Sequence, residues 1–239
     1  MQEHIQYLKH GENKHGNVNA NICDDFACCQ AWISKEERLS KWEESKKEEN
    51  WKKIENAIKE TSGKIITYQN EPINALFHAS SGGITEVPVN VWGGTSYPYL
   101  QVVETAGEEG YTQYASEVEL TNEELLEKLK TKYENIQIDF GNLEDIKILE
   151  HTDGKRVKTV KFGNTQISGV ETRTLLGLKS TNFEITRQNE KIKFTVKGYG
   201  HGVGMSQTGA DTLAKQGKTC SEIINHYYKE IEIKEINNI

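Results

Sequence analysis

A segment near the C-terminal end, residues 198–207, constrains the fold more than any other part of the chain. It reads GYGHGVGMSQ, in which four glycines within seven positions flank His201. A strand interior does not tolerate so many glycines, and a flexible linker would need neither the histidine nor the apolar Val-Gly-Met run. The pattern predicts a rigid turn that places His201 in a cleft, with Ser206 capping the next helix. Because the GxGxxG spacing and its acidic partner are lacking, a nucleotide site is disfavoured.

A second glycine segment, HASSGGITE, covers residues 78–86 and follows a predicted strand over 73–79. The strand would deliver His78 to its end, and the two glycines would let the backbone come close to a ligand. Small hydroxyl groups here could bond sugar hydroxyls and N-acetyl amides. We expect Ser81 to supply such a hydroxyl, and Gly82 and Gly83 to line the ligand site. An ordinary glycine turn with a satisfied histidine is the alternative.

A third segment, residues 173–183, reads RTLLGLKSTNF. Its leucines have helical spacing and predict a short buried turn, from which Lys179 and Ser180 emerge toward a ligand. A core turn with solvated polar residues remains the alternative.

The rest of the pattern predicts an α+β fold of antiparallel hairpins, with several helices around one substrate cleft. The expected strands cover residues 64–70, 73–79, 145–151, 156–162, 182–188, 191–197 and 231–236. Expected capping boxes join Ser34 to Glu37, Thr121 to Glu124 and Thr219 to Glu222. We expect one domain that comprises a metal-binding region over 1–33, a charged helix over 34–62 and a β-rich core over 63–239.

Charge and hydropathy exclude two classes of partner. The net charge of −7 disfavours non-specific binding to nucleic acid. The predicted helix over 34–60 carries eight charges of each sign between Lys35 and Glu60, which indicates a solvated face. No apolar run is long enough for a membrane span. The polar start MQEHIQYLKH shows no targeting segment, so the sequence contains no address.

Cysteines cluster near the start of the chain. Cys23, Cys28 and Cys29 fall within seven positions, downstream of His15. Thiolates and an imidazole are the ligands that zinc prefers, and four protein ligands would close its shell. The cluster predicts a structural zinc site, with free or buried thiols as the alternative. Cys220 stands alone and is expected to be a buried helix residue.

Three blocks together resemble the stage II sporulation protein D family, to which amidase-enhancer proteins are related. They are HASSGGITE, LLGLKSTNFEI and YGHGVGMSQTGA followed by HYYKEIEI. The resemblance runs from about residue 2 to the C-terminus. It implies a lytic transglycosylase that cuts the glycan strands of peptidoglycan, after an amidase has removed the stem peptides. It also implies zinc bound by His15, Cys23, Cys28 and Cys29.

The resemblance further implies partners and a location. Peptidoglycan strands, a cell-wall amidase and other engulfment proteins would be the partners, at the septal wall on the outer face of the cell membrane. The substrate groove would be lined by His78, Ser81, Gly82, Gly83, Lys179, Ser180, His201, Ser206 and Gln207. The two histidines would orient sugar groups or the catalytic acid.

The family's catalytic glutamate lies in an E-M-P-like motif that this sequence does not contain. The expectation is that the motif lies upstream of residue 1, so that the chain binds glycan weakly and cleaves little. A single carboxyl that cycles between acid and base is central to this reaction, and its loss costs about 100- to 10,000-fold in rate. Glu86 is the best stand-in, ahead of Glu104 and Glu171, although each is better explained as a structural or solvated carboxylate.

Two other functions are compatible with the sequence. A non-catalytic module could bind denuded glycan and enhance a partner amidase, as the amidase-enhancer resemblance suggests. A zinc hydrolase would need an open metal position, which four closely spaced ligands argue against.

Overall fold

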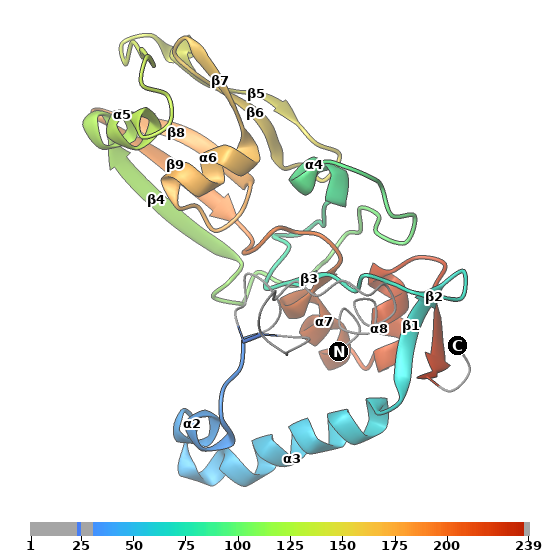
Figure 1. Ribbon diagram of the computed structural model, residues 1–239. Helices are drawn as coiled ribbons and strands as arrows, with labels where there is room; N and C mark the ends of the chain where they lie inside the picture. The colour runs from blue at the N-terminus through green and yellow to red at the C-terminus, as the bar shows by residue number, and fades with distance from the viewer. Residues whose placement is uncertain (1–22, 25–30, 237–239) are drawn as a thin grey trace. The chain divides into compact units, whose positions relative to one another are not determined.

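A computed structural model describes residues 23–24 and 31–236, and the chain divides into two compact units (Figure 1). The smaller unit comprises residues 1–75 and 231–239, and the larger comprises residues 76–230. Both combine helices with small, mainly antiparallel sheets, which confirms the predicted α+β class. Within the described residues, no helix is both long and apolar enough to cross a membrane.

The smaller unit contains a three-stranded sheet in the order β11-β1-β2. Its strands are β1 (Lys64–Tyr68), β2 (Glu71–Pro72) and β11 (Glu232–Glu235). In β1, Ile65 and Thr67 are buried while their neighbours are more exposed, as the alternating pattern predicts. Gln69 and Asn70 both have positive φ, of 50° and 69°, and form the tight turn into β2.

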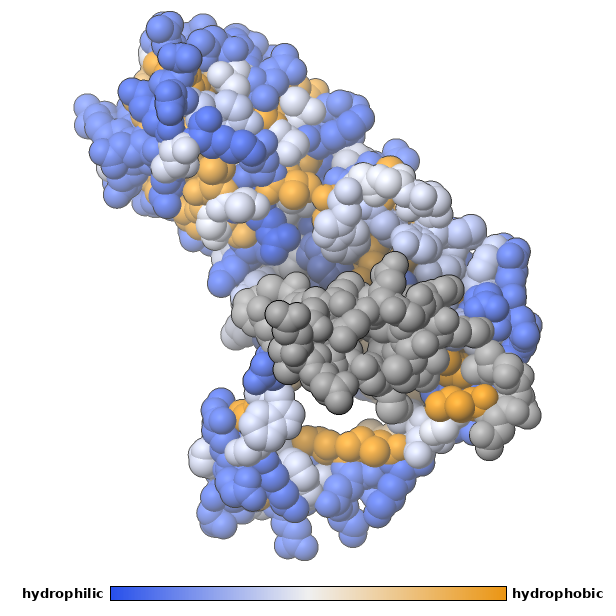
Figure 2. All heavy atoms as spheres, viewed as in Figure 1, coloured by the Kyte–Doolittle hydropathy of each residue, from blue (hydrophilic) through white to orange (hydrophobic). Residues whose placement is uncertain are grey.

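The charged segment of the smaller unit forms two helices, α2 (Lys35–Ser40) and α3 (Glu44–Thr61). The predicted continuous helix is therefore wrong at residues 41–43, where Glu43 starts α3 without a side-chain cap. Neither helix buries a residue, and Glu–Lys pairs of i,i+3 and i,i+4 spacing cover their surfaces. An apolar band lies along α3, where Ile58 is 63% exposed (Figure 2).

Two three-stranded antiparallel sheets form one part of the larger unit, in the orders β4-β9-β8 and β5-β6-β7. Their strands are β4 (Ala115–Thr121), β5 (Ile146–His151), β6 (Val157–Phe162), β7 (Thr165–Ser168), β8 (Asn182–Gln188) and β9 (Lys191–Lys197). Two hairpins match the prediction to within one residue. Asn189, with φ of 55°, makes the turn between β8 and β9.

The core of the larger unit lies among these strands and two helices, α5 (Asn122–Lys130) and α6 (Gly169–Leu176). Leu125 and Leu129 of α5 have no exposed surface, and they belong to the same cluster as Phe162 and Phe194. Burial of each such side chain contributes about 1.5–3 kcal/mol. The predicted capping box of Thr121 and Glu124 is present and fixes the start of α5.

Short elements make up the other part of the larger unit. They are β3 (Phe77–His78), α4 (Pro88–Trp92), β10 (Met205–Ser206), α7 (Gln207–Lys215) and α8 (Cys220–Tyr227). The 3-10 helix η1 (Leu143–Asp145) instead leads directly into β5. The strand predicted over 73–79 is wrong except at residues 77–78. The Leu76 carbonyl, just before β3, accepts hydrogen bonds from the Met205 amide of β10 and from the Tyr228 hydroxyl.

The ends of α7 and α8 follow the sequence closely. Ser206 caps α7 by accepting a hydrogen bond from the Gly209 amide, and the capping box of Thr219 and Glu222 starts α8. The predicted burial of Cys220 is wrong: it is exposed at the first position of α8, one turn before the buried Ile223.

Candidate functional site

The two glycine segments meet through a parallel pair of very short strands. In this pair, His78 of β3 lies opposite Ser206 of β10. Two further backbone hydrogen bonds, of 3.1 and 2.8 Å, join Ser80 and Tyr199 in both directions. Residues about 120 positions apart in the sequence are thereby fixed side by side.

Glycine is needed at this junction because the backbones of the two segments lie so close together that a side chain on either one would collide with the other. A Cβ atom on Gly82 would lie 2.7 Å from the Lys197 carbonyl carbon and 2.8 Å from the Gly198 nitrogen. A Cβ on Gly198 would lie 2.7 Å from the Ser80 carbonyl oxygen. Both glycines also have positive φ, of 73° and 79°, which favours glycine independently.

The two predicted histidines come together at this junction. The ring centroids of His78 and His201 are 5.6 Å apart in an edge-on arrangement, and the Trp92 ring lies 5.0 Å from that of His201. His78 Nδ1 donates to the Val203 carbonyl at 3.1 Å, which leaves its Nε2 as an acceptor. His201 Nδ1 accepts from the Val203 amide at 3.0 Å, so its proton sits on Nε2.

Both histidines are uncharged at neutral pH. Burial, with the charges of His201 and Arg156, lowers the pKa of His78 to about 3. Burial also lowers the pKa of His201 to about 4, although a hydrogen bond with the Phe77 backbone opposes the shift. Groups with such pKa values are poorly matched to proton transfer at pH 7, so orienting a ligand suits them better.

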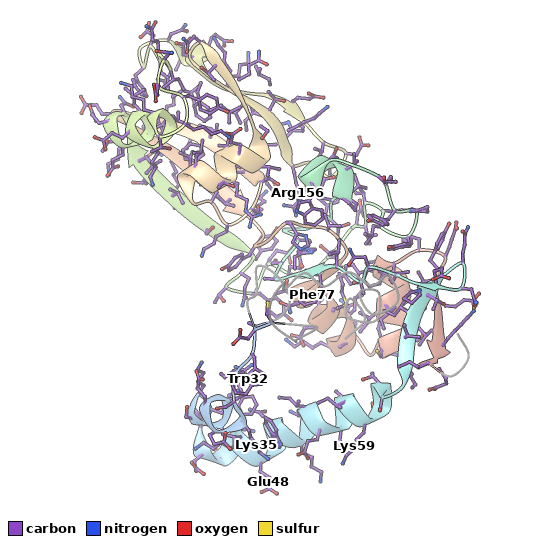
Figure 3. All side chains as sticks on the ribbon, in the orientation of Figure 1. Trp32, Lys35, Glu48, Lys59, Phe77 and Arg156 are labelled. Carbon is purple, nitrogen blue, oxygen red and sulfur yellow. The ribbon has the colours of Figure 1, made fainter. Side chains whose placement is uncertain are left out.

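Arg156 lies near α4, at the end of the β5–β6 hairpin (Figure 3), and its charge acts on both histidines. Its guanidinium is 1% exposed and donates from Nη2 to the Ser81 carbonyl at 2.9 Å. Its Nε and Nη1, like Nε2 of His78, have no hydrogen-bond partner among the described residues. Burial lowers the pKa of Arg156 to about 10, against the attraction of Glu86, so it stays charged at pH 7.

Glu108 is the residue of this site that the sequence did not reveal. Its carboxylate has no exposed surface and accepts six hydrogen bonds. The donors are the hydroxyls of Ser81, Thr105, Ser206 and Thr208 and the backbone amides of Ser81 and Gly83. Burial acts to raise the pKa of Glu108, but the hydrogen bonds outweigh it and lower the pKa. Glu108 is therefore an ionised link between the two glycine segments.

Several residues that were predicted to contact a ligand point into the protein interior. Ser81 and Ser206 have no exposed surface and point their hydroxyls at Glu108. Ser180 is equally buried and donates to the Lys197 carbonyl. Gln207 is exposed at the start of α7, and Lys179 is exposed beside Tyr199. Contact of these residues with substrate stays a prediction.

Glu86, the predicted stand-in for a catalytic acid, has a structural role here. It is 1% exposed and accepts hydrogen bonds from the Val87 amide at 2.8 Å, from Asn90 Nδ2 at 2.9 Å and from the Thr152 hydroxyl. These bonds fix the start of α4, which carries Trp92. The two weaker candidates for a catalytic acid are not buried carboxyls either. Glu104 is exposed, and Glu171 forms a salt bridge with Lys132.

A hollow of about 620 Å³ lies beside the HASSGG loop. Gly82 and Gly83 line it, as the sequence predicts for a groove. Its other lining residues are Ile84, Glu104, Thr105, Ala106, Glu109, His151, Lys155, Asn182, Phe183, Glu184 and Lys197. Acidic and basic side chains are mixed there, so the hollow has no dominant charge.

The predicted zinc ligands lie largely outside the described residues. His15, Cys28 and Cys29 fall there, whereas Cys23 is a half-buried free thiol. Among residues 23–24 and 31–236, no three histidine, cysteine, aspartate or glutamate side chains gather as a metal site. Zinc binding stays a prediction.

Comparison with known proteins identifies the class. A family model described as "Stage II sporulation protein" matches residues 4–68, and one described as "Domain of unknown function (DUF8618)" matches residues 102–204. Stage II sporulation protein D of Bacillus subtilis (strain 168) is 36% identical over 215 residues, covering 90% of this chain and 60% of that protein. Its counterpart from Bacillus amyloliquefaciens is 35% identical over 218 residues, covering 91% and 61%.

The chain is thus related to bacterial sporulation proteins. In particular, it belongs to the stage II sporulation protein D family, as the three sequence blocks predict. The amidase enhancer of B. subtilis is a more distant relative, 28% identical over 222 residues, covering 72% of this chain and 31% of that protein. The chain spans about 60% of the length of the sporulation proteins that it matches.

Proposed function

We propose that this chain binds the glycan strands of peptidoglycan, within the sporulation-related role in the cell wall that its relatives indicate. The finer activity we infer is that of a lytic transglycosylase acting on denuded strands. The observation that carries the proposal is the contact of the His201 ring with the rings of His78 and Trp92, where the two histidines lie on rigidly joined glycine segments and Trp92 lies on α4. His78 is buried, so the half-buried, neutral imidazole of His201 and the exposed ring of Trp92 are the groups suited to a polar, uncharged sugar ring.

The described part of the site supports binding more directly than cleavage. A general acid needs a carboxyl whose pKa is raised toward neutrality. The pKa of Glu108 is lowered, and Glu86 is fully engaged by three donors. Cleavage would therefore need a carboxylic acid other than these two, with the histidines orienting the substrate.

The test uses the purified chain and glycan strands from which an amidase has removed the stem peptides. We expect sedimentation with the strands, loss of this binding in Trp92→Ala, and little anhydro-sugar product by mass spectrometry. Failure of the unaltered chain to bind would overturn the proposal. Abundant anhydro-muramic products would instead show that the chain supplies its own acid.

A second function, enhancement of a cell-wall amidase, is favoured by the relative named amidase enhancer. In this case the chain would bind denuded glycan, the product of the amidase, without cleaving it, and would enhance the amidase at the septal wall among other engulfment proteins. The test measures release of stem peptides by an N-acetylmuramoyl-L-alanine amidase with and without the chain. An unchanged rate at saturating chain would exclude this function.

A further inference from the structure

The hollow of about 620 Å³ beside the HASSGG loop has charged side chains of both signs in its lining. We propose that it binds a short zwitterionic peptide, with the ammonium of the peptide at Glu104 and Glu109 and a carboxylate at Lys155 and Lys197. This inference rests on the proposed function, because the role in the cell wall supplies the class of peptide: the stem peptides that an amidase releases from glycan strands.

The charges of this lining are grouped by segment. Glu104 and Glu109 belong to the segment between α4 and β4. Lys155 belongs to the turn between β5 and β6, and Lys197 ends β9. Glu184, which also lines the hollow, lies 4.0 Å from Lys197 and offsets part of its charge. The acidic and basic groups thus come from different parts of the larger unit.

Three of these groups have no partner of their own. In the described part of the chain, neither the carboxylates of Glu104 and Glu109 nor the ammonium of Lys155 forms a salt bridge or a side-chain hydrogen bond. Exposed charges elsewhere do pair, as Lys158 does with Glu150. A ligand with one sign of charge would be attracted to one group and repelled by the other, so a ligand with both signs fits best.

The two basic side chains extend from fixed backbone positions. Lys155 has a positive φ of 56°, and its amide donates to the Thr152 carbonyl at 2.9 Å within the turn. The Thr152 hydroxyl donates to buried Glu86, which anchors the turn. Lys197 lies within the β4-β9-β8 sheet, and a Cβ on Gly82 would lie 3.0 Å from its Cβ. Little backbone freedom would therefore be lost when these lysines bind a carboxylate.

The acidic segment is held in the same way. Glu104 forms an isolated antiparallel bridge with Ile84, and its carbonyl accepts from His226 Nε2 at 3.0 Å. Glu109 directly follows Glu108, whose carboxylate accepts six hydrogen bonds. Only the side chains of the two lining glutamates would need to adjust to an ammonium group.

Both charges occur together in the stem peptides of peptidoglycan, whereas its N-acetylated sugars carry no ammonium group. While a stem peptide is attached to a strand, its first nitrogen forms an uncharged amide with the lactyl group. Hydrolysis by an amidase turns that nitrogen into an ammonium group, near the carboxylates of the following residue. The hollow would thus hold the released peptide in preference to the attached one.

Isothermal titration calorimetry of the unaltered chain compares three probes: L-alanyl-D-glutamate, its N-acetyl form, and its form with both carboxylates converted to amides. We expect the first to bind about tenfold or more tightly than either of the others, since each masked form loses a charged contact. Equal affinity for the free form and either masked form, or no binding of the free form, would overturn the inference.

Denuded glycan strands, titrated in parallel, separate this inference from the proposed function. Binding of the glycan without the dipeptide would overturn the peptide site alone. Binding of the dipeptide without the glycan would overturn the proposed function and keep the peptide site.

Variants then locate the peptide. The double variant Glu104→Gln with Glu109→Gln is expected to bind the free dipeptide no more tightly than the N-acetyl form, and Lys155→Ala to bind it more weakly than the unaltered chain. Glu127→Gln in α5 removes a charge from an exposed position outside the hollow and is expected to change nothing. A tenfold preference for the free form that survives in the double variant, folded by circular dichroism, would place peptide binding elsewhere.

Discussion

At the scale of single residues, Glu108 organises the site. Its two carboxylate oxygens divide their donors so that each accepts one backbone amide: Ser81 at one oxygen and Gly83 at the other. A hydroxyl can rotate to become an acceptor, but a backbone amide cannot. The site therefore requires an acceptor at both positions, which only a carboxylate provides.

We expect Glu108→Gln to lower the free energy of unfolding by about 3 kcal/mol, because its NH₂ group must face one of these amides in a buried site. Urea denaturation would measure the change. Glu109→Gln removes the same charge from an exposed neighbour and should change stability by less than about 0.5 kcal/mol. Equal stability of the two variants would show that Glu108 is dispensable.

The buried histidines make a separate prediction about pH. The pKa of His78, about 3, lies below the value of about 6.5 expected in the unfolded chain. Between these values the unfolded chain binds a proton that the folded chain does not, so stability falls on acidification by about 1.4 kcal/mol per pH unit. His201, with a pKa of about 4, adds a similar slope over its own range.

Urea denaturation at pH 5, 6 and 7 would measure this slope, with His78→Gln as the comparison. The variant lacks the buried titrating group, so its stability should change less with pH than that of the unaltered protein. Parallel curves for the two proteins would contradict the lowered pKa of His78. Glu108 contributes to stability through its charged form, because the folded protein lowers its pKa. This contribution to the free energy of unfolding is present above the unfolded pKa of about 4.3 and is lost only as the pH falls below it.

At the scale of elements, two strands of two residues each hold the site, and glycine contacts replace the rest of a sheet. We expect Gly82→Ala to destabilise the protein by about 3 kcal/mol or more, because its methyl group would overlap the Lys197–Gly198 backbone. Gly177→Ala is the matched control. Gly177, at the end of α6, has nearly the same φ, 71°, in the left-handed region but faces open space, so only conformational strain of about 1–2 kcal/mol is expected. Similar losses in thermal or urea denaturation would show that close approach is unimportant.

Elements with local signals could be predicted from the sequence, whereas those fixed by distant contacts could not. The hairpins β5–β6 and β8–β9 carry alternating side chains and turn residues, and three helix starts carry their caps. The convergence of His78 and His201 followed from their glycine surroundings. Glu108 has no such signal, because its partners at Ser81 and Ser206 lie 27 and 98 positions away. The strand predicted over 73–79 is wrong for the same reason, because a distant contact fixes this segment: the Tyr228 hydroxyl, 152 positions on, donates to the Leu76 carbonyl.

At the scale of the whole molecule, the two units differ in what stabilises them. The larger unit has a core in which Ile192, Phe194 and Val196 of β9 have no exposed surface. In the smaller unit, α2 and α3 bury no residue. Their exposed ion pairs contribute only about 0.3–0.5 kcal/mol each. Among the described residues, α3 thus lacks the buried face from which most helical stability in proteins comes.

We therefore expect the backbone amides of α3 to exchange with deuterated solvent through local opening, within minutes, and those of β9 only through global unfolding. Hydrogen exchange followed by mass spectrometry would measure both in one sample. Sub-denaturing urea should accelerate exchange in β9 and leave α3 nearly unchanged, because only global opening exposes much new surface. Protection of α3 equal to that of β9 would show that something covers its apolar band, and that the helix unfolds together with the core.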